Sequence, residues 1–209
     1  MEHSRFARQP LRVGGVVLCG GESRRMGESK AWLPFGDETL LARIVRVAST
    51  GVSPVVVATR HGVDLPPLPA GVEVVFDAEE SRGPLAGIAA GFDALADCCD
   101  AILVVPCDHA LLTRAFIERL IALIGDHSAV VPESDGHLFP TLAVYRMEAR
   151  DVVHDLLASG AFRAGEMVAR CRTRFLRPRD FADIDPNQLV LRNMNTPEEY
   201  QAILHMALP

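Results

Sequence analysis

Residues 13–30 read VGGVVLCGGESRRMGESK, an apolar run followed by a long loop of glycine, serine and charged residues. The apolar run from Val13 to Leu18 predicts a buried strand that ends before Gly20 and Gly21. Open α/β sheets bind ligands in the loops at the carboxyl ends of their strands. Glycines in such a loop let the backbone approach a polyphosphate and direct its amide groups toward it. The stretch therefore predicts a nucleotide-binding loop at the edge of an α/β sheet.

This loop differs from the two commonest phosphate-binding motifs. A P-loop would read Gly-x-x-x-x-Gly-Lys-[Ser/Thr], whereas here five residues separate Gly21 from Gly27 and Glu28 follows. The dinucleotide fingerprint Gly-x-Gly-x-x-Gly is also absent, which disfavours a Rossmann dehydrogenase. The loop still holds cations suited to a triphosphate, namely Arg24, Arg25 and Lys30.

The composition fits one domain and excludes several classes of partner. The chain has 209 residues, of which 49% are hydrophobic, enough for a sizeable core. Its net charge of −6 gives no basic field for nucleic acid, and no apolar run approaches the roughly 20 residues of a membrane span. Five cysteines without Cys-x-x-Cys spacing suit a reducing cytosol and give no zinc site. We expect a flexible tail over residues 1–12, a domain over 13–209, and a cytoplasmic protein.

Strand and helix patterns alternate along the first half of the chain. This alternation predicts a three-layer α/β/α sandwich, a single Rossmann-like domain with a mostly parallel sheet covered on both faces. The patterns place strands at 55–58, 72–76 and 101–105, and helices at 39–49, 84–95 and 113–124.

The second half carries shorter elements. Segments 129–131 and 141–145 flank the turn signal Ser134-Asp135-Gly136-His137, which predicts a local antiparallel pair. In the last helix, Thr196 is the expected N-cap and Glu199 completes a capping box. Helices are also expected at 147–157 and 164–170, and short strands at 173–176 and 189–191.

A carboxylate ends the strand at 101–105, in the sequence Val104-Val105-Pro106-Cys107-Asp108. If the strands are parallel, Asp108 lies at the same sheet edge as the glycine loop. A hard oxygen ligand there can hold Mg²⁺ with phosphates and water completing the coordination. The alternative role, capping the next helix, is better filled by Thr113.

Three further segments each have two interpretations. Asp77 ends a strand before Gly83-Pro84-Leu85-Ala86-Gly87, whose small residues allow either close helix–sheet packing or the approach of a ligand. Asn193 and Asn195 precede a helix N-terminus, where they either shape a capped turn or contact an anion. A basic cluster is either a solvated face or a site for an anionic substrate; it comprises Arg163, Arg170, Arg172, Arg174, Arg177 and Arg179.

From about residue 15 to residue 200, the chain resembles the nucleotidyltransferases that include the molybdenum cofactor guanylyltransferases. The resemblance is carried by Leu-x-Gly-Gly-x-Ser-x-Arg-Met-Gly-x-x-Lys at 18–30, Leu-Pro-Phe-Gly at 33–36, Gly-Pro-Leu-Ala-Gly at 83–87 and Asn-x-Asn-Thr-Pro-Glu-Glu at 193–199. The chain departs from the family pattern at three positions. Ala58-Thr59 stands where an Asn is frequent, Ala110 where a Pro is frequent, and Phe139 where a His is frequent.

The resemblance implies a reaction, a metal and roles for particular residues. The terminal phosphate of molybdopterin would attack the α-phosphorus of GTP, with Mg²⁺ held by Asp108, and molybdopterin guanine dinucleotide would form. Arg25, Lys30 and Asp108 would be catalytic, and Asn193 and Asn195 would bind the acceptor. The implied nucleotide-binding residues are Leu18, Cys19, Gly20, Gly21, Ser23, Arg24, Gly27, Lys30, Asp77, Leu85, Gly87 and Asp108.

The implied partners are GTP, molybdopterin and, in transient contact, other proteins of cofactor synthesis or molybdoenzymes, with no nucleic acid and no membrane. Two alternatives remain open. A cytidylyltransferase, on the same cofactor or on a small alcohol phosphate, would often read Ala-Ala-Gly in place of Leu18-Cys19-Gly20-Gly21 and lack Gly-Pro-Leu-Ala-Gly. A non-catalytic nucleotide or cofactor binder would be expected to have lost the cation or the metal ligand, and both Lys30 and Asp108 are present.

Overall fold

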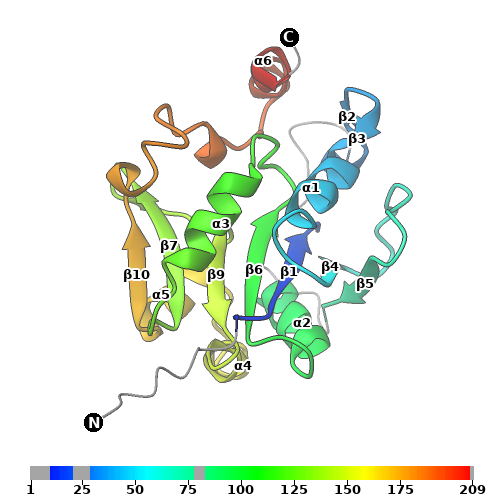
Figure 1. The fold of residues 1–209 in the computed structure, drawn as a ribbon. Helices are drawn as coiled ribbons and strands as arrows, with labels where there is room; N and C mark the ends of the chain where they lie inside the picture. The colour runs from blue at the N-terminus through cyan, green and yellow to red at the C-terminus, as the bar shows by residue number, and fades with distance from the viewer. Residues whose placement is uncertain (1–9, 21–28, 78–82, 208–209) are drawn as a thin grey trace.

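The computed structural model describes residues 10–20, 29–77 and 83–207. Its centre is a sheet with the strand order β10-β7-β9-β6-β1-β4-β5, to which β8 is added by pairing with β7 (Figure 1). The strands are β1 (Val13–Leu18), β4 (Val55–Thr59), β5 (Glu73–Phe76), β6 (Ala101–Pro106), β7 (Ala129–Ser134), β8 (His137–Leu138), β9 (Ala143–Arg146) and β10 (Thr173–Leu176). A separate hairpin joins β2 (Pro34–Phe35) to β3 (Glu38–Thr39).

The sheet is mostly parallel, as predicted. β1 runs parallel to β4 and β6, β4 to β5, and β7 to β10, whereas β9 runs against both of its neighbours. The expected local antiparallel pair is also present, because Ala129 pairs with Tyr145, and at the turn itself Ser134 pairs with His137. That turn requires positive φ at Asp135 and Gly136, which are 50° and 75°.

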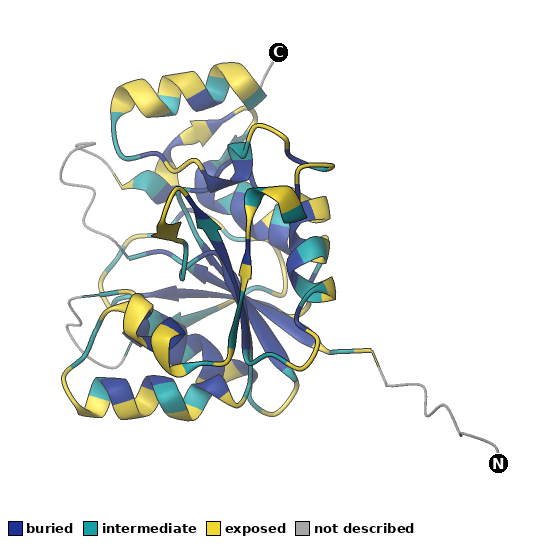
Figure 2. Cartoon of the chain, turned by 90° about the vertical axis from the view of Figure 1, so that its left-hand side faces the viewer, coloured by how far each residue is buried: buried dark blue, intermediate teal, exposed yellow. Residues whose placement is uncertain are grey.

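Helices cover both faces and complete the predicted three layers. The buried sides of α1 (Leu40–Ala48) and α3 (Arg114–Ala122) join one apolar cluster, and those of α2 (Leu85–Leu95), α4 (Ala149–Ala158) and α5 (Ala164–Arg170) join the other. The strands lie buried between layers whose outer surfaces are exposed (Figure 2). Three 3₁₀ turns, η1 (Lys30–Trp32), η2 (Pro178–Asp180) and η3 (Leu189–Leu191), lie in the described connections.

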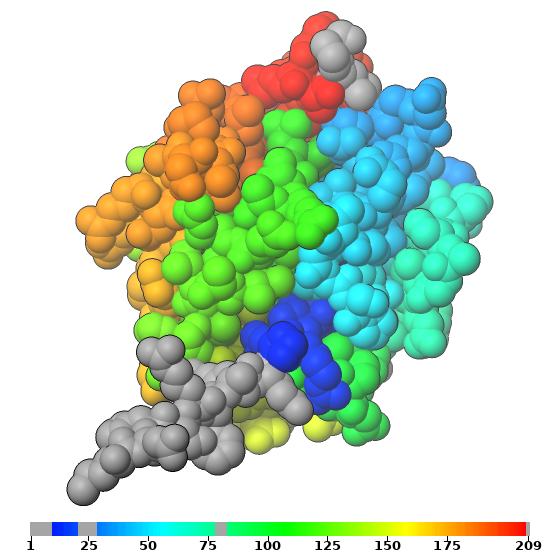
Figure 3. Space-filling view, in the orientation of Figure 1, coloured from blue at the N-terminus to red at the C-terminus, as the bar shows by residue number. Residues whose placement is uncertain are grey.

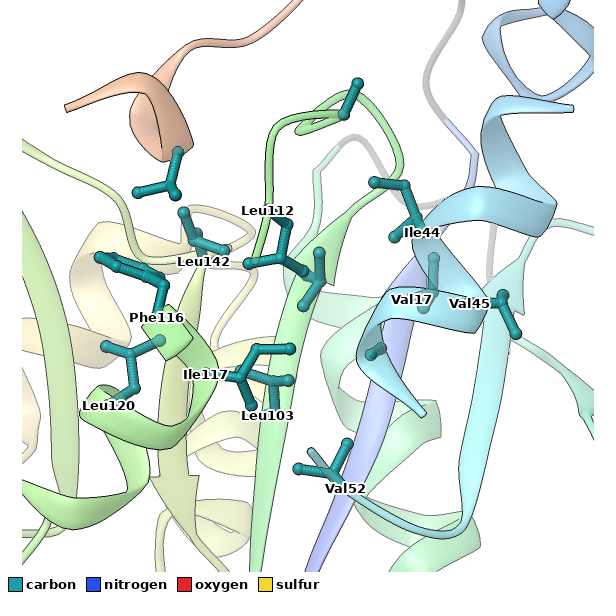
Figure 4. Close-up of a cluster of buried hydrophobic side chains, with 14 of the residues drawn as sticks. Val17, Ile44, Val45, Val52, Leu103, Leu112, Phe116, Ile117, Leu120 and Leu142 are labelled. Carbon is teal, nitrogen blue, oxygen red and sulfur yellow. The ribbon is translucent and has the colours of Figure 1, made fainter. Parts of the chain in front are cut away.

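Successive side chains along each strand point to opposite faces of the sheet and so contribute to two separate cores. Val17 and Leu103 point to the face of α1 and α3, where they meet Ile44, Phe116 and Ile117 (Figure 4). Their neighbours point to the opposite face, because successive side chains of a strand alternate. Truncating a fully buried aromatic such as Phe116 to alanine would destabilise the fold by roughly 3–5 kcal/mol.

Small residues let α2 approach the sheet closely, which confirms the packing interpretation of its sequence. A Cβ on Gly91 would lie 2.5 Å from the Val16 side chain, closer than packed carbon atoms can be. A Cβ on Gly87 would lie 3.1 Å from Leu18 Cδ2. The N-terminal part of α2 is therefore held against the carboxyl end of β1.

The prediction of a strand at residues 189–191 was wrong. These residues form the 3₁₀ turn η3, because the buried Asp185 carboxylate accepts hydrogen bonds from Leu189 N and Val190 N, both at 2.9 Å. Gln188 precedes the turn with φ of 53°, a left-handed conformation that breaks an extended chain. A short apolar run cannot distinguish these two outcomes without its neighbours.

The last helix, α6 (Pro197–Ala207), begins as predicted. Thr196 Oγ1 accepts from Glu199 N at 3.2 Å, and Glu199 Oε2 accepts from Thr196 N at 3.1 Å, which completes the capping box. The helix lies beyond the carboxyl end of β6 (Figure 1) and forms the top of the molecule in the space-filling view (Figure 3). Its Tyr200 Oη donates to the carbonyl of Pro34.

Of the expected tail, residues 1–9 lie outside the described part of the chain. At its other end, the Arg12 guanidinium and amide bind the Asp100 carboxylate immediately before β6. Among the described helices, none has both the length and the apolar character needed to cross a bilayer.

Candidate active site

Four parallel strands place their carboxyl ends at one edge of the sheet. Leu18 is in register with Ala58 on one side and Pro106 on the other, and Thr59 is in register with Phe76. The residues that follow β1, β4, β5 and β6 therefore emerge side by side below α6 (Figure 1). As expected from the sequence, this edge collects Gly20, Asp77 and Asp108.

Lys30 lies at the centre of this edge. Its Nζ is 3.0 Å from Asp108 Oδ2 and 2.9 Å from Asn195 Oδ1, so that the end of the glycine loop, the end of β6 and the start of α6 meet at one ammonium group. The side chains of Lys30 and Asp108 are 16% and 19% exposed, which leaves the pair reachable from outside but weakly screened.

Lys30 is also the only lysine in the chain, which otherwise takes all its permanent cations from arginine. An ammonium is a compact point charge with three donors, whereas a guanidinium is a wide planar fork. One compact ammonium therefore donates to both Asp108 Oδ2 and Asn195 Oδ1.

The Asp108 carboxylate is held in its ionised form. Burial opposes ionisation, but the hydrogen bond with His109 and the positive charge of Lys30 outweigh it and lower the pKa of Asp108 below its usual value. His109 Nδ1 lies 3.0 Å from Asp108 Oδ1, so each carboxylate oxygen has a partner on a different side.

The turn that carries Asp108 is fixed by its own backbone and by α1. His109 N donates to the Pro106 carbonyl at 3.4 Å, and Leu112 N donates to the His109 carbonyl at 3.1 Å. Arg43, from α1, donates its Nε to the carbonyl of Ala110 at 2.9 Å. The family proline that Ala110 replaces is thus not needed to shape this turn.

The donor set fits a hard divalent cation that shares its coordination with phosphates. The carboxylate oxygen of Asp108 and the amide oxygen of Asn195 already converge on a cationic group, and oxygen atoms are the ligands that Mg²⁺ and Mn²⁺ prefer. Within the described part of the chain, no three His, Cys, Asp or Glu side chains come together as a metal cage. A metal here would therefore need oxygen ligands from the substrate and water.

The expected nucleotide-binding residues line the same edge where the structure describes them. Cys19 N donates to the Ala58 carbonyl at 2.8 Å, and Asp77 N donates to the Thr59 carbonyl at 3.0 Å. Leu18 is half-buried beside Gly87, whereas Leu85 is fully buried in the second core, so only its backbone can reach a ligand. The others expected here, namely Gly21, Ser23, Arg24, Arg25 and Gly27, lie outside the described residues.

Two thiols lie beneath this edge. Cys19 follows β1 and Cys107 follows β6, and their side chains influence each other's ionisation. The interaction with Cys107 lowers the pKa of Cys19, whereas the interaction with Cys19 together with burial raises the pKa of Cys107. All five cysteines of the chain are free thiols.

The two expected acceptor residues have different surroundings. Asn195 contacts Lys30 directly, whereas Asn193 is exposed. Sequence reasoning did not predict the contact between Asn195 and Lys30, because the two residues are 165 positions apart. It also gave no role to His109, because adjacency to Asp108 in sequence does not show whether the two side chains meet.

The basic cluster lies elsewhere. Arg174 belongs to β10, an edge strand three places along the sheet from β6, and Arg177 Nε lies 3.5 Å from Glu133 Oε2. Most of the cluster is exposed. This position favours a solvated face over a part of the site at Lys30.

Comparison with known proteins agrees with this arrangement. The family model described as "MobA-like NTP transferase domain" matches residues 15–174. The chain belongs to this family. It is therefore a nucleotidyltransferase, and the matched segment includes both the glycine loop and Asp108.

A curated relative from Bacillus mycoides, named probable molybdenum cofactor guanylyltransferase, is 28% identical over 193 residues, which cover 90% of this chain and 94% of the relative. Among solved structures, the molybdopterin-guanine dinucleotide biosynthesis protein A from Archaeoglobus fulgidus superposes with a TM-score of 0.75 at 20% identity, covering 92% of this chain and 97% of the other. At this identity, the likeness shows the fold.

Two further structures share the fold. The 2-C-methyl-D-erythritol 4-phosphate cytidylyltransferase from Thermus thermophilus has a TM-score of 0.68 at 16% identity, covering 92% of this chain and 97% of its own. A protein from Mycobacterium tuberculosis, solved in complex with manganese, has a TM-score of 0.62 at 18% identity, covering 93% and 98%. The fold thus occurs in a transferase with another base and in a protein that binds a divalent metal.

Proposed function

We propose that the protein transfers GMP from GTP to the terminal phosphate of molybdopterin, forming molybdopterin guanine dinucleotide and pyrophosphate. The observation that carries this proposal is the meeting of Lys30, Asp108 and Asn195 at the sheet edge. One cation, one ionised carboxylate and one amide from three separate segments suit the joining of two phosphate-bearing substrates. The guanylyltransferase names of the curated relatives support the choice of nucleotide and acceptor.

The reaction is an in-line displacement at phosphorus. An oxygen of the acceptor phosphate forms a bond to the α-phosphorus of GTP, and the bond from the α-phosphorus to the oxygen bridging to the β-phosphorus breaks. Pyrophosphate carries away the electron pair. No general base is needed, because a phosphate monoester has lost most of its second proton at neutral pH. The protein must therefore position the phosphates and neutralise their charge.

Each residue of the constellation has a role in that task. The Lys30 ammonium offsets negative charge on the departing phosphates, and the amide of Asn195 holds Lys30 in position. Asp108, with its lowered pKa, stays ionised at neutral pH and would hold Mg²⁺. When bound, this ion neutralises phosphate oxygens. Arg25 and the glycine loop would also contact the triphosphate.

A cytidylyltransferase is the second candidate, because the Thermus thermophilus enzyme shares this fold. The sequence Leu18-Cys19-Gly20-Gly21 and the Gly-Pro-Leu-Ala-Gly segment at 83–87 favour guanine over it. A site that hydrogen bonds the guanine edge leaves buried groups unpaired when cytosine binds. One or two such groups, at about 1–3 kcal/mol each, give roughly ten- to more than a hundredfold discrimination.

Pyrophosphate release with each of the four nucleoside triphosphates tests the proposal. The purified protein is incubated with Mg²⁺ and molybdopterin, and reactions without the acceptor serve as the control. We expect release with GTP that depends on molybdopterin, and a kcat/KM for CTP at least about tenfold lower. Equal kcat/KM for GTP and CTP would favour the cytidylyltransferase, and no release with any nucleotide would favour a non-catalytic binder.

The proposal extends to the cellular setting. Five free thiols suit a reducing compartment, so we place the enzyme in the cytoplasm. Its product would pass by transient contact to other proteins of cofactor synthesis or to molybdoenzymes.

A further inference from the structure

His109 is a buried imidazole with a single partner in the described part of the chain. It is 4% exposed, its Nδ1 lies 3.0 Å from Asp108 Oδ1, and its buried Nε2 has no hydrogen-bond partner among the described residues. A buried nitrogen without a partner destabilises a fold, and an apolar side chain of similar size would avoid that cost. The contact with Asp108 is therefore the feature that distinguishes histidine at this position.

The chemistry of the contact fixes its direction. A carboxylate at neutral pH accepts hydrogen bonds and has no proton to donate, so the proton between the two groups belongs to Nδ1. His109 thus donates to Oδ1, while Oδ2 faces the cationic Lys30 at 3.0 Å. With one oxygen fixed from the core side, the carboxylate plane cannot rotate freely about its Cβ–Cγ bond.

The backbone around His109 adds to this restraint. Its amide and its carbonyl both take part in the turn that follows β6, through Pro106 and Leu112, and Arg43 holds the next carbonyl. The imidazole is therefore presented to Asp108 by a fixed turn rather than by a mobile segment.

We infer that His109 is a positioning residue. Its Nδ1–H orients the Asp108 carboxylate toward the place beside Lys30 where a divalent cation would bind. This inference rests on the proposed function, in which Asp108 holds a divalent metal. Hydrogen bonds to ligating groups commonly change metal affinity or activity by about 10- to 100-fold, so the expected effect is on the metal and not on the nucleotide.

Three substitutions separate the hydrogen bond from the packing. In His109→Asn, the amide nitrogen is attached to Cγ, as Nδ1 is, and can still donate to Asp108. In His109→Gln, the amide nitrogen is one bond further out, at the place of Nε2. His109→Leu fills the space without a donor. Thermal unfolding of each variant shows whether it folds.

Mn²⁺ binding is measured by electron paramagnetic resonance, in samples that contain GTP and an excess of protein over GTP. We expect the affinity for Mn²⁺ to fall about 10- to 100-fold in the Gln and Leu variants and to stay within about threefold of the wild type in the Asn variant. The affinity for GTP without metal should not change in any of them.

Wild-type Mn²⁺ affinity in the Gln and Leu variants would overturn the inference. An Asn variant that binds Mn²⁺ as weakly as the Leu variant would also overturn it, because a donor at the place of Nδ1 would then have no effect on the metal. An Asp108→Asn variant serves as the reference for the metal itself. If it binds Mn²⁺ as well as the wild type does, the metal role of Asp108 in the proposed function fails, and the positioning role fails with it.

Discussion

The two halves of the sheet reach the site in different ways. From β1 to β6, the site residues belong to the segments that follow parallel strands: Gly20 and Lys30 come from the segment after β1, and Asp108 from the segment after β6. Beyond β6, the sheet turns mixed, and Asn195 reaches the site only because the chain returns over the sheet edge to begin α6. The first half therefore supplies chemistry through local sequence, and the second half supplies it through a tertiary contact.

This difference implies that the two halves have different roles in catalysis. Asp108 and Lys30 from the first half carry the charges that neutralise phosphate, whereas Asn195 from the second half adjusts where Lys30 sits. Substitutions in the first half should therefore cost more activity than those in the second. Four predictions test this ranking, each within the proposed function.

Replacement of Asp108 should have the largest effect. In Asp108→Asn, we expect turnover to fall by more than about 10³-fold, because losing the metal ligand removes several kcal/mol of transition-state stabilisation. Calorimetry with GTP, with and without Mg²⁺, should show that nucleotide affinity is largely kept and its dependence on metal is lost. Asp100→Asn, at the opposite end of β6, is the matched control and should behave like the wild type. Unchanged metal dependence in Asp108→Asn would make the carboxylate structural.

Removal of the Lys30 charge should come next. We expect Lys30→Ala to lower kcat/KM by at least about 10²-fold with the fold intact, a loss comparable to that of other groups that stabilise transition-state charge. Lys30→Arg is the informative partner, because it keeps the charge but not the compact shape. It should recover only part of the lost activity. Unchanged kcat/KM in a folded Lys30→Ala variant would remove Lys30 from the mechanism.

Asn195 should matter less than either of these. Asn195→Ala loses a hydrogen bond to a charged group, worth about 1.5 kcal/mol at the low end, so we expect roughly a tenfold loss in kcat/KM. Asn193→Ala, two residues away and exposed, should lose much less if Lys30 is the target of the effect. Equal losses in the two variants would indicate that the segment contacts the acceptor as a whole and not through Lys30.

The smallest effect on activity should come from substitutions that destabilise the second half away from the site. Asp185 accepts two backbone hydrogen bonds in η3, so Asp185→Ala should lower the free energy of unfolding by about 2–3 kcal/mol while activity falls only a few-fold. Chemical denaturation measures the first quantity and steady-state kinetics the second. The exposed Asp183, paired with Arg119, provides the control, and its removal should leave the denaturation midpoint nearly unchanged. A loss of activity in Asp185→Ala as large as in Lys30→Ala would contradict the different roles proposed for the two halves.

The fold of the first half was predictable because its signals are local. Apolar runs set the strands, and the N-caps Thr39 and Thr113 fixed the starts of α1 and α3. Parallel register then determined that Gly20 and Asp108 share an edge. The family pattern added roles for Lys30 and Asp108, and the structure brings the two side chains into contact at that edge.

In the second half, the helices α4, α5 and α6 and the strand β10 were predictable from local patterns, but three features were not. η3 depends on a side chain of Asp185 reaching back to two amides, and no periodicity records that. The meeting of Asn195 with Lys30 requires the whole sheet to be in place first. His109 was overlooked because a histidine beside an aspartate in sequence gives no indication of whether their side chains meet.

A double-substitution cycle on Lys30 and Asn195 tests most directly whether the two halves form one site. The kcat/KM for GTP is measured at saturating molybdopterin for the wild type, Lys30→Ala, Asn195→Ala and the double variant. Because Asn195 is proposed to act through Lys30, the double variant should lose about 10²-fold, no more than Lys30→Ala alone. A loss of about 10³-fold, the product of the two single effects, would show that the residues act independently and would contradict this account.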